Sequence, residues 1–162
     1  MTLPSEYTFR EPEKLVNDLT EMYRLLRESI EGYTEEFEGV IFGSSADGVG
    51  TYTSNDCYYV RRGTVIDLFY NIVWSAHTGT GDLRIKLPFF EKGFASPVSI
   101  SPIVVDNITW PSGNHYLVVE GQPNQDYAII KSCKTNAASQ TVQMDGSAGI
   151  NFHHRYIGQV EK

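Results

Sequence analysis

A seven-residue repeat of apolar side chains near the N-terminus constrains the fold of this chain more than any other feature. The repeat runs through residues 12–38 and fills two heptad positions that lie three residues apart. Side chains at those positions share one stripe of an α-helix, which is the pattern of a coiled coil. The sequence therefore predicts a coiled-coil helix over residues 12–40. Its predicted trimerisation seam consists of Val16, Leu19, Tyr23, Leu26, Ile30, Tyr33 and Phe37.

The width of this stripe favours three helices over two. Leu15 and Met22 flank the seam, and its aromatic residues need more central space than a dimer offers. The alternative is a single amphipathic helix that packs on its own domain. Gly32 and the glutamates that follow Tyr33 weaken the second half, so we expect the helix to end between Tyr33 and Gly39.

Beyond residue 40 the apolar period changes to that of β-strands. Short apolar runs alternate with turn residues, and no helical run interrupts them. This pattern predicts an antiparallel β-sandwich over residues 41–162, jelly-roll-like and similar to trimeric domains of the complement or tumour-necrosis-factor type. The nine predicted strands span residues 49–53, 56–61, 64–76, 82–88, 98–104, 115–120, 127–133, 139–144 and 149–160.

Two long strands predict which side chains form the core. Alternate residues of a strand point to the same face of a sheet. The apolar set of the 64–76 strand is Ile66, Leu68, Tyr70, Ile72 and Trp74, and we expect it in the core. The matching set of the last strand is Ile150, Phe152, His154 and Tyr156. The opposite faces carry polar residues such as Asp67, Asn71 and Arg155, so they are expected to be half covered, with a neighbouring subunit as one candidate cover.

The charge distribution excludes one class of partner. Residues 1–41 hold ten acidic and four basic side chains, so most of the formal net charge of −7 lies there. The chain has no basic stripe, and we expect no binding to nucleic acid. Neither a signal peptide nor a membrane-spanning run is expected. Cys57 and Cys133 are compatible with one disulfide or with two free thiols.

The run from Ile72 to Ile85, followed by Leu87-Pro88-Phe89, resembles a hairpin found in C-terminal domains of bacteriophage tail fibres and related trimeric virion fibre proteins. A Gly50-Thr51-Tyr52 strand precedes it, as in those proteins, and a last strand closes around Tyr156-Ile157-Gly158. The resemblance covers residues 48–90 best. It implies a trimeric, jelly-roll-like virion domain that contacts the host surface.

One loop has the composition of a sugar-binding surface. Trp110, Asn114, His115 and Tyr116 lie within a few residues of one another. An aromatic ring stacks on sugar C–H groups while amides and imidazoles reach the hydroxyls, so these four are the predicted ligand-binding residues. The alternative is that Trp110 packs beneath the loop.

The motifs of common enzymes are missing from the sequence. It has no phosphate-binding loop, no dinucleotide fingerprint and no nucleophile elbow. Its carboxylates are scattered over turns without a paired spacing. His153 and His154 are expected to point to opposite faces of one strand, so they cannot easily share one metal within a subunit, although three copies of one histidine around a trimer axis could. We expect no catalytic residue, no metal and no cofactor.

These features together predict a non-enzymatic bacteriophage protein of the fibre or receptor-binding type. It is expected to be made in the host cytoplasm and to reside in the virion, attached to a capsid or tail protein by an anchoring peptide, residues 1–11. A disordered tail is the alternative for that segment. The expected partners are further copies of the chain and a host surface glycan or receptor. Three other functions remain open at this stage: a capsid decoration or cement protein, a cellular trimeric ligand, and a glycan depolymerase.

Overall fold

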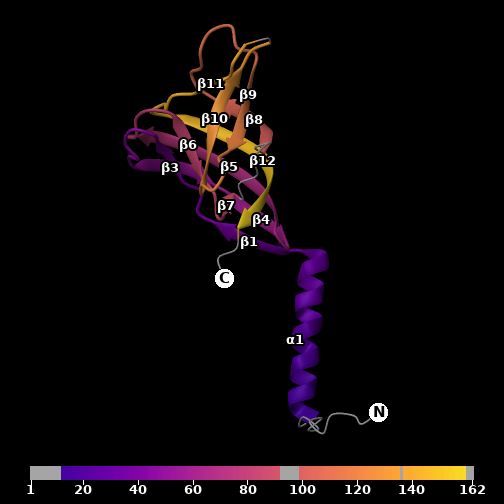
Figure 1. Ribbon diagram of the computed structural model, residues 1–162. Helices are drawn as coiled ribbons and strands as arrows, with labels where there is room; N and C mark the ends of the chain where they lie inside the picture. The colour runs from indigo at the N-terminus through magenta and orange to yellow at the C-terminus, as the bar shows by residue number, and fades with distance from the viewer. Residues whose placement is uncertain (1–11, 92–98, 136, 160–162) are drawn as a thin grey trace.

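The computed structural model describes residues 12–91, 99–135 and 137–159. In that part of the chain, one helix precedes a β domain (Figure 1). The helix is α1 (Pro12–Glu31). The strands are β1 (Tyr33–Phe37), β2 (Ile41–Gly43), β3 (Gly50–Asn55), β4 (Cys57–Arg62), β5 (Val65–His77), β6 (Leu83–Lys86), β7 (Phe90–Glu91), β8 (Ile100–Asp106), β9 (Tyr116–Gly121), β10 (Tyr127–Cys133), β11 (Gln140–Thr141) and β12 (Ala148–Gln159).

The strands form one curled antiparallel sheet. Its order is β1-β4-β5-β12-β8-β9-β10-β6-β2, with β3 on β5, β7 on β12 and β11 on β10. The sheet turns its corner within β8, because the first half of this strand pairs with β9 and the second half pairs with β12. Pro102 is paired with β9 and Ile103 with β12, so the change of partner falls between these two residues. The prediction of a mainly β, antiparallel domain is confirmed.

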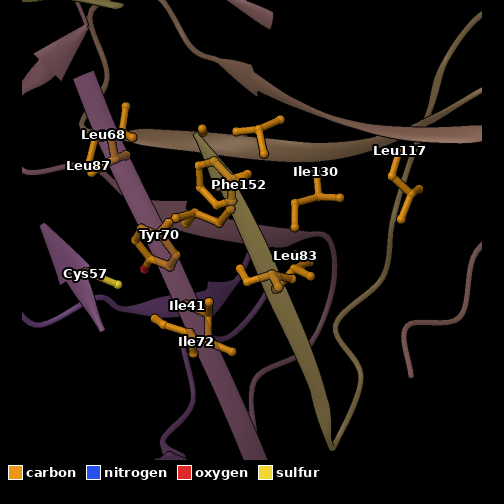
Figure 2. Close-up of a cluster of buried hydrophobic side chains, with 14 of the residues drawn as sticks. Ile41, Cys57, Leu68, Tyr70, Ile72, Leu83, Leu87, Leu117, Ile130 and Phe152 are labelled. Carbon is orange, nitrogen blue, oxygen red and sulfur yellow. The ribbon is translucent and has the colours of Figure 1, made fainter. Parts of the chain in front are cut away.

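The interior is filled by the two faces that the sequence predicts. All the predicted core residues of β5 and β12 are buried, and they meet apolar side chains from β2, β6, β9 and β10. Figure 2 shows Tyr70 and Phe152 next to one another, and they are paired residues of the adjacent strands β5 and β12 with ring centroids 5.1 Å apart. Ile72 and Ile41 lie beneath them, and Leu83 and Ile130 beside them (Figure 2).

The prediction that the helix extends to residue 40 is wrong beyond Glu31. Gly32 adopts a φ of +86°, a left-handed conformation that favours glycine and that ends the helix. Tyr33 and Phe37, two of the predicted seam residues, therefore lie on β1, which pairs with β4. Phe37 packs against Tyr59 and Tyr70 at centroid distances of 6.1 and 6.0 Å. The partial burial of Phe37 against the core and the pairing of β1 with β4 stabilise the extended conformation over one more turn of helix.

Each of the nine predicted strands overlaps an observed strand, with bounds that differ by up to a few residues. The sequence analysis missed β1, β2 and β7, which are short and lack a full alternating pattern. The two cysteines are free thiols, with Cys57 buried. Burial raises the pKa of the Cys57 thiol to about 11, so this side chain behaves as a small apolar core residue. The predicted anchoring peptide, residues 1–11, lies outside the described residues.

Candidate ligand-binding groove

The candidate site lies at the end of the β domain opposite to α1. The helix contacts β4, beside the start of β5, whereas β5 ends at His77. A strand of 13 residues is about 40 Å long. The start of β12 and the end of β8 lie near the far end of β5, because Ala148 pairs with Trp74 and Gly149 with Asp106. Figure 1 shows α1 as a stalk at one end of the molecule and the loop between β8 and β9 at the other.

Two adjoining hollows form a groove between the loop that follows β8 and the loop that precedes β12. One has a volume of about 480 Å³ and the other about 360 Å³. Thr109 and Asp145 line both, so the two hollows meet at these two residues. The first is otherwise lined by Ser75, Ala76, His77, Asn107, Gly146 and Ser147, and the second by Trp110, Pro111, Thr141 and Gln143. We call this feature the distal groove.

Hydrogen bonds join the two loops that form the walls. Asn107, held in the left-handed region at a φ of 56°, donates its amide Nδ2 to the carbonyl oxygen of Ser147 at 3.0 Å. The backbone N–H of Thr109 donates to Asp145 Oδ2 at 2.6 Å. From the core, Trp74 Nε1 donates to the carbonyl oxygen of Asp145 at 3.0 Å. The groove is therefore formed before a ligand arrives.

The hairpin from Ile72 to Ile85, whose sequence resembles that of tail-fibre domains, supports the loop that precedes β12. Gly81 accepts a hydrogen bond from the backbone N–H of Met144 at 2.8 Å, and Asp82 accepts one from the side-chain amide of Gln143 at 2.8 Å. His77 Nδ1 accepts the N–H of Gly79, so Nε2 carries the proton and donates to the carbonyl oxygen of Ile41 at 3.2 Å. The hairpin thus fixes both the loop above it and the strand beside it.

The four predicted ligand-binding residues do not gather in one place. Trp110 lines the distal groove and is 38% exposed. Asn114 instead donates its side-chain amide to Ser132 Oγ at 2.7 Å and to Gln140 Oε1 at 3.3 Å, so it braces the loop. His115 and Tyr116 are exposed at the start of β9, and neither lines the groove.

The sequence reasoning missed most of the residues that surround Trp110. Asn107 and Thr109 precede it in the same loop, but Gln143, Asp145 and Ser147 come from a loop more than 30 residues later. The pairing of β8 with β12 brings the two loops together. No local motif records that pairing, although the Asp145-Gly146-Ser147 turn composition was a signal for an exposed loop.

A second polar cluster lies on the outer face of the sheet, where Asp67 is the shared partner of three side chains. Arg155 donates to both of its carboxylate oxygens at 2.6 and 3.0 Å, and Arg62 and His153 approach them at 3.3 and 3.2 Å. Hydrogen bonds from Arg155 hold the pKa of the Asp67 carboxyl below its usual value. Beside it, the ring of Phe69 stacks between Tyr58 and His153 at 4.5 and 4.4 Å.

Replacing Asp67 by Asn should therefore lower the free energy of unfolding by about 2 kcal/mol, because charge-assisted hydrogen bonds from β4 and β12 to a buried carboxylate are lost. Urea denaturation at pH 7 measures this change. Asp106→Asn, at an exposed carboxylate on β8, is the control and should change the value by less than about 0.5 kcal/mol. Equal effects from the two variants would show that the cluster contributes no specific stability.

The described residues hold no group of three or more His, Cys, Asp or Glu side chains positioned to bind a metal ion. His153 and His154 point to opposite faces of β12, as predicted, with His154 fully buried. Within the same part of the chain, no helix has the length and apolar character needed to cross a membrane.

Comparison with known proteins identifies a shared fold but assigns the chain to no family. No protein-family model matches the chain, and no curated protein matches it either. Among solved structures, the chain is similar to the Dettilon tailspike protein, with a TM-score of 0.61 and 16% sequence identity. The match covers 79% of this chain but only 24% of the tailspike. At this identity the likeness establishes a shared fold over most of the chain.

Proposed function

We propose that this chain is a non-enzymatic, trimeric structural protein of a bacteriophage virion, of the fibre or receptor-binding type. It is attached to a capsid or tail protein through residues 1–11 and presents its β domains to the host surface. The observation that carries the virion assignment is the shared fold with the Dettilon tailspike protein over 79% of the chain. The hairpin from Ile72 to Ile85 points the same way, since its sequence resembles that of tail-fibre domains.

Trimerisation is supported by the apolar stripe of α1. Val16, Leu19, Tyr23, Leu26 and Ile30 are half or more exposed in the single chain. A contiguous apolar stripe of this size on a soluble protein marks an interaction surface. The ion pairs of the helix, Arg24 with Glu21 and Arg27 with Glu31, leave that stripe free. Three copies would bury one another's stripes, and the heptad spacing of the five residues fits such a seam.

The sandwich architecture supports the same class of protein. Because β8 changes partner midway, the sheet folds over so that β5 and β12 face β6, β9 and β10 across the core. We infer a jelly-roll-like sandwich, an architecture common in viral capsid and lectin domains.

A binding role without catalysis is supported by the carboxylates of the distal groove. Glycoside hydrolysis by the usual mechanism requires two carboxyl groups that flank the bond to be cleaved. Asp145 is the one carboxylate among the described residues that line the groove. Asp82 lies behind it and accepts a hydrogen bond from Gln143.

The trimer is tested by light scattering on paired leucine variants of the full chain. Leu26 lies on the proposed seam and the adjacent Leu25 does not, yet both are 53% exposed in the single chain. The wild-type protein should have about three times the chain mass of 18.2 kDa. Leu26→Ser should shift the population toward monomer, because about 2 kcal/mol of burial is lost per chain, which raises the trimer dissociation constant roughly ten-thousandfold.

Leu25→Ser is the matched control and should leave the mass at that of a trimer. A monomeric wild-type protein would contradict the proposed assembly. A trimer that survives Leu26→Ser as well as Leu25→Ser would show that the β domains hold the assembly together and that α1 is not its seam.

A further inference from the structure

We propose that the distal groove binds a neutral oligosaccharide, with one sugar face stacked on Trp110 and its hydroxyl groups held by Asp145 and the side chains around it. This inference rests on the proposed receptor-binding function, and it names the class of ligand and the residues that recognise it. The proposed binding site excludes His115 and Tyr116 and includes the loop that precedes β12.

The apolar contribution comes from Trp110 and Pro111, which line one end of the groove together. The chain has two tryptophans, and their environments differ: Trp74 is 1% exposed and Trp110 is 38% exposed. A large aromatic ring left partly in water inside a hollow is a ready surface for stacking. The ring faces of hexoses carry C–H groups, which pack against the electron-rich face of an indole.

The polar contribution comes from acceptors that the protein itself leaves available. Asp145 uses Oδ2 to accept the backbone N–H of Thr109, and Oδ1 has no hydrogen-bond partner among the described residues. Asn107 uses its amide Nδ2 on Ser147, so its Oδ1 is a further acceptor at the other end. Sugar hydroxyl groups are donors as well as acceptors, and a row of carboxylate and amide oxygens fits them.

The charge of the groove selects against anionic sugars. Its lining contains the carboxylate of Asp145 and no lysine or arginine among the described residues. A sialate, uronate or sulfate group placed there would meet a like charge without a cation to compensate for its desolvation. A neutral glycan meets neither penalty.

The walls of the groove are fixed in advance, which favours affinity for a flexible ligand. The two loops are joined by the Asn107 and Thr109 hydrogen bonds, and Trp74 and Gly81 hold the second loop from beneath. Little protein entropy is then lost on binding. Three such grooves at the helix-distal end of one trimer would reach a polysaccharide surface together, so that weak sites act by avidity.

The test is the retention of the full-length protein on a glycan microarray that carries neutral hexose oligosaccharides beside sialylated, uronate-containing and sulfated ones. Retention should be confined to neutral glycans. Trp110→Ala should reduce it at least tenfold, and Asp145→Asn, which keeps an oxygen for the N–H of Thr109, should reduce it severalfold. Tyr116→Ala removes a 55% exposed aromatic outside the groove and should leave retention unchanged. Retention on anionic glycans, retention that survives Trp110→Ala, or no retention on any glycan would overturn the inference.

A second measurement decides the matter without any variant. Acrylamide quenches exposed tryptophans, so in the wild-type protein it reports on Trp110 while Trp74 stays protected. A neutral glycan retained on the array should protect Trp110 from quenching, and unchanged quenching at saturating glycan would place the ligand elsewhere. The masses of the same samples separate the two proposals: a trimer without glycan binding overturns the groove alone, whereas a monomer overturns the proposed assembly.

Discussion

Gly48→Ala is expected to lower the free energy of unfolding by about 2–5 kcal/mol. Gly48 has a φ of +75°, which costs an alanine about 1–2 kcal/mol. A Cβ at this position would also collide with the backbone nitrogen and Cα of Gly79, and backbone atoms cannot rotate away. Overpacking of this kind adds roughly 1–3 kcal/mol. The total is a large part of the 5–15 kcal/mol by which domains are typically stable.

Two other glycines of the chain separate these contributions. Gly63 has a φ of +62° with nothing within 4 Å of an added Cβ, so Gly63→Ala should show the backbone cost alone, about 1 kcal/mol. Gly146 has neither a positive φ nor a neighbour within 4 Å, and Gly146→Ala should change stability by less than about 0.5 kcal/mol. Urea denaturation at one fixed protein concentration measures all three variants. Equal values for Gly48→Ala and Gly63→Ala would show that the hairpin yields to the added methyl group.

The close approach at Gly48 explains the glycines of the tail-fibre-like hairpin. The segment from Gly43 to Gly48 packs backbone against backbone on the hairpin from Thr78 to Gly81, and added Cβ atoms at Gly43 and Gly79 would collide there too. This packing fixes the position of the hairpin beneath the loop that precedes β12. A change at Gly48 is therefore expected to disturb the distal groove as well as the stability.

The sequence predicts the β domain well because its strands obey a simple rule. In most of β12, and in β5 apart from the buried Asp67, buried residues alternate with more exposed ones, so Ile66 and Phe152 are assignable to the core from period alone. The short strands β2 and β7 have too few residues to show a period.

The predicted end of the helix is wrong because the spacing of Tyr33 and Phe37 fits both a helix and a strand. Tyr33 and Phe37 are four residues apart, which keeps them on the heptad stripe of a helix and also on one face of a strand. Gly32 decides between the two, since its left-handed conformation turns the chain into β1. The sequence carries that signal in Gly32, whereas the apolar heptad repeat that continues to Phe37 favours a longer helix.

Trp110 shows where sequence reasoning about the candidate site stops. Its exposure in a loop follows from composition, but its neighbours Gln143 and Asp145 come from another loop. Their proximity depends on the register of β8 against β12, which depends in turn on how the whole sheet closes. Local patterns carry no information about that closure.

His154 should make the folded protein less stable as the pH falls from about 6.5 to about 4. The imidazole is fully buried on β12, and burial, with a smaller contribution from the charge of His153, lowers its pKa to about 4. The unfolded chain binds a proton at the ordinary histidine pKa of about 6.5, whereas the native state binds one only near pH 4. Between these values the unfolded state holds more protons, so the free energy of unfolding decreases by about 1.4 kcal/mol per pH unit, or roughly 3 kcal/mol in all.

The partners of His154 explain why the native state keeps it neutral. Ser101 Oγ lies 2.9 Å from Nδ1 and Ser99 Oγ lies 2.9 Å from Nε2, so a neutral ring has one hydrogen bond at each nitrogen. The rings of Phe152 and Tyr156 pack near it at centroid distances of 6.4 and 5.7 Å. No carboxylate is paired with the ring among the described residues, so a charge there has nothing to offset its desolvation.

The measurement is urea denaturation of the wild type and of His154→Gln at several pH values between 7 and 4, at one protein concentration. His154→Gln should be less stable at pH 7, because the ring and its two hydrogen bonds are lost. Its free energy of unfolding should also fall less steeply as the pH decreases, because the variant lacks the imidazole that takes up a proton on unfolding. His115→Gln, at an exposed histidine before β9, should keep the wild-type slope. Parallel curves for the wild type and His154→Gln would show that the buried imidazole is not the group that senses pH. A slope that flattens only in His154→Gln would assign the acid sensitivity of the β domain to one residue that lies across the sheet from the ion-pair cluster of Asp67.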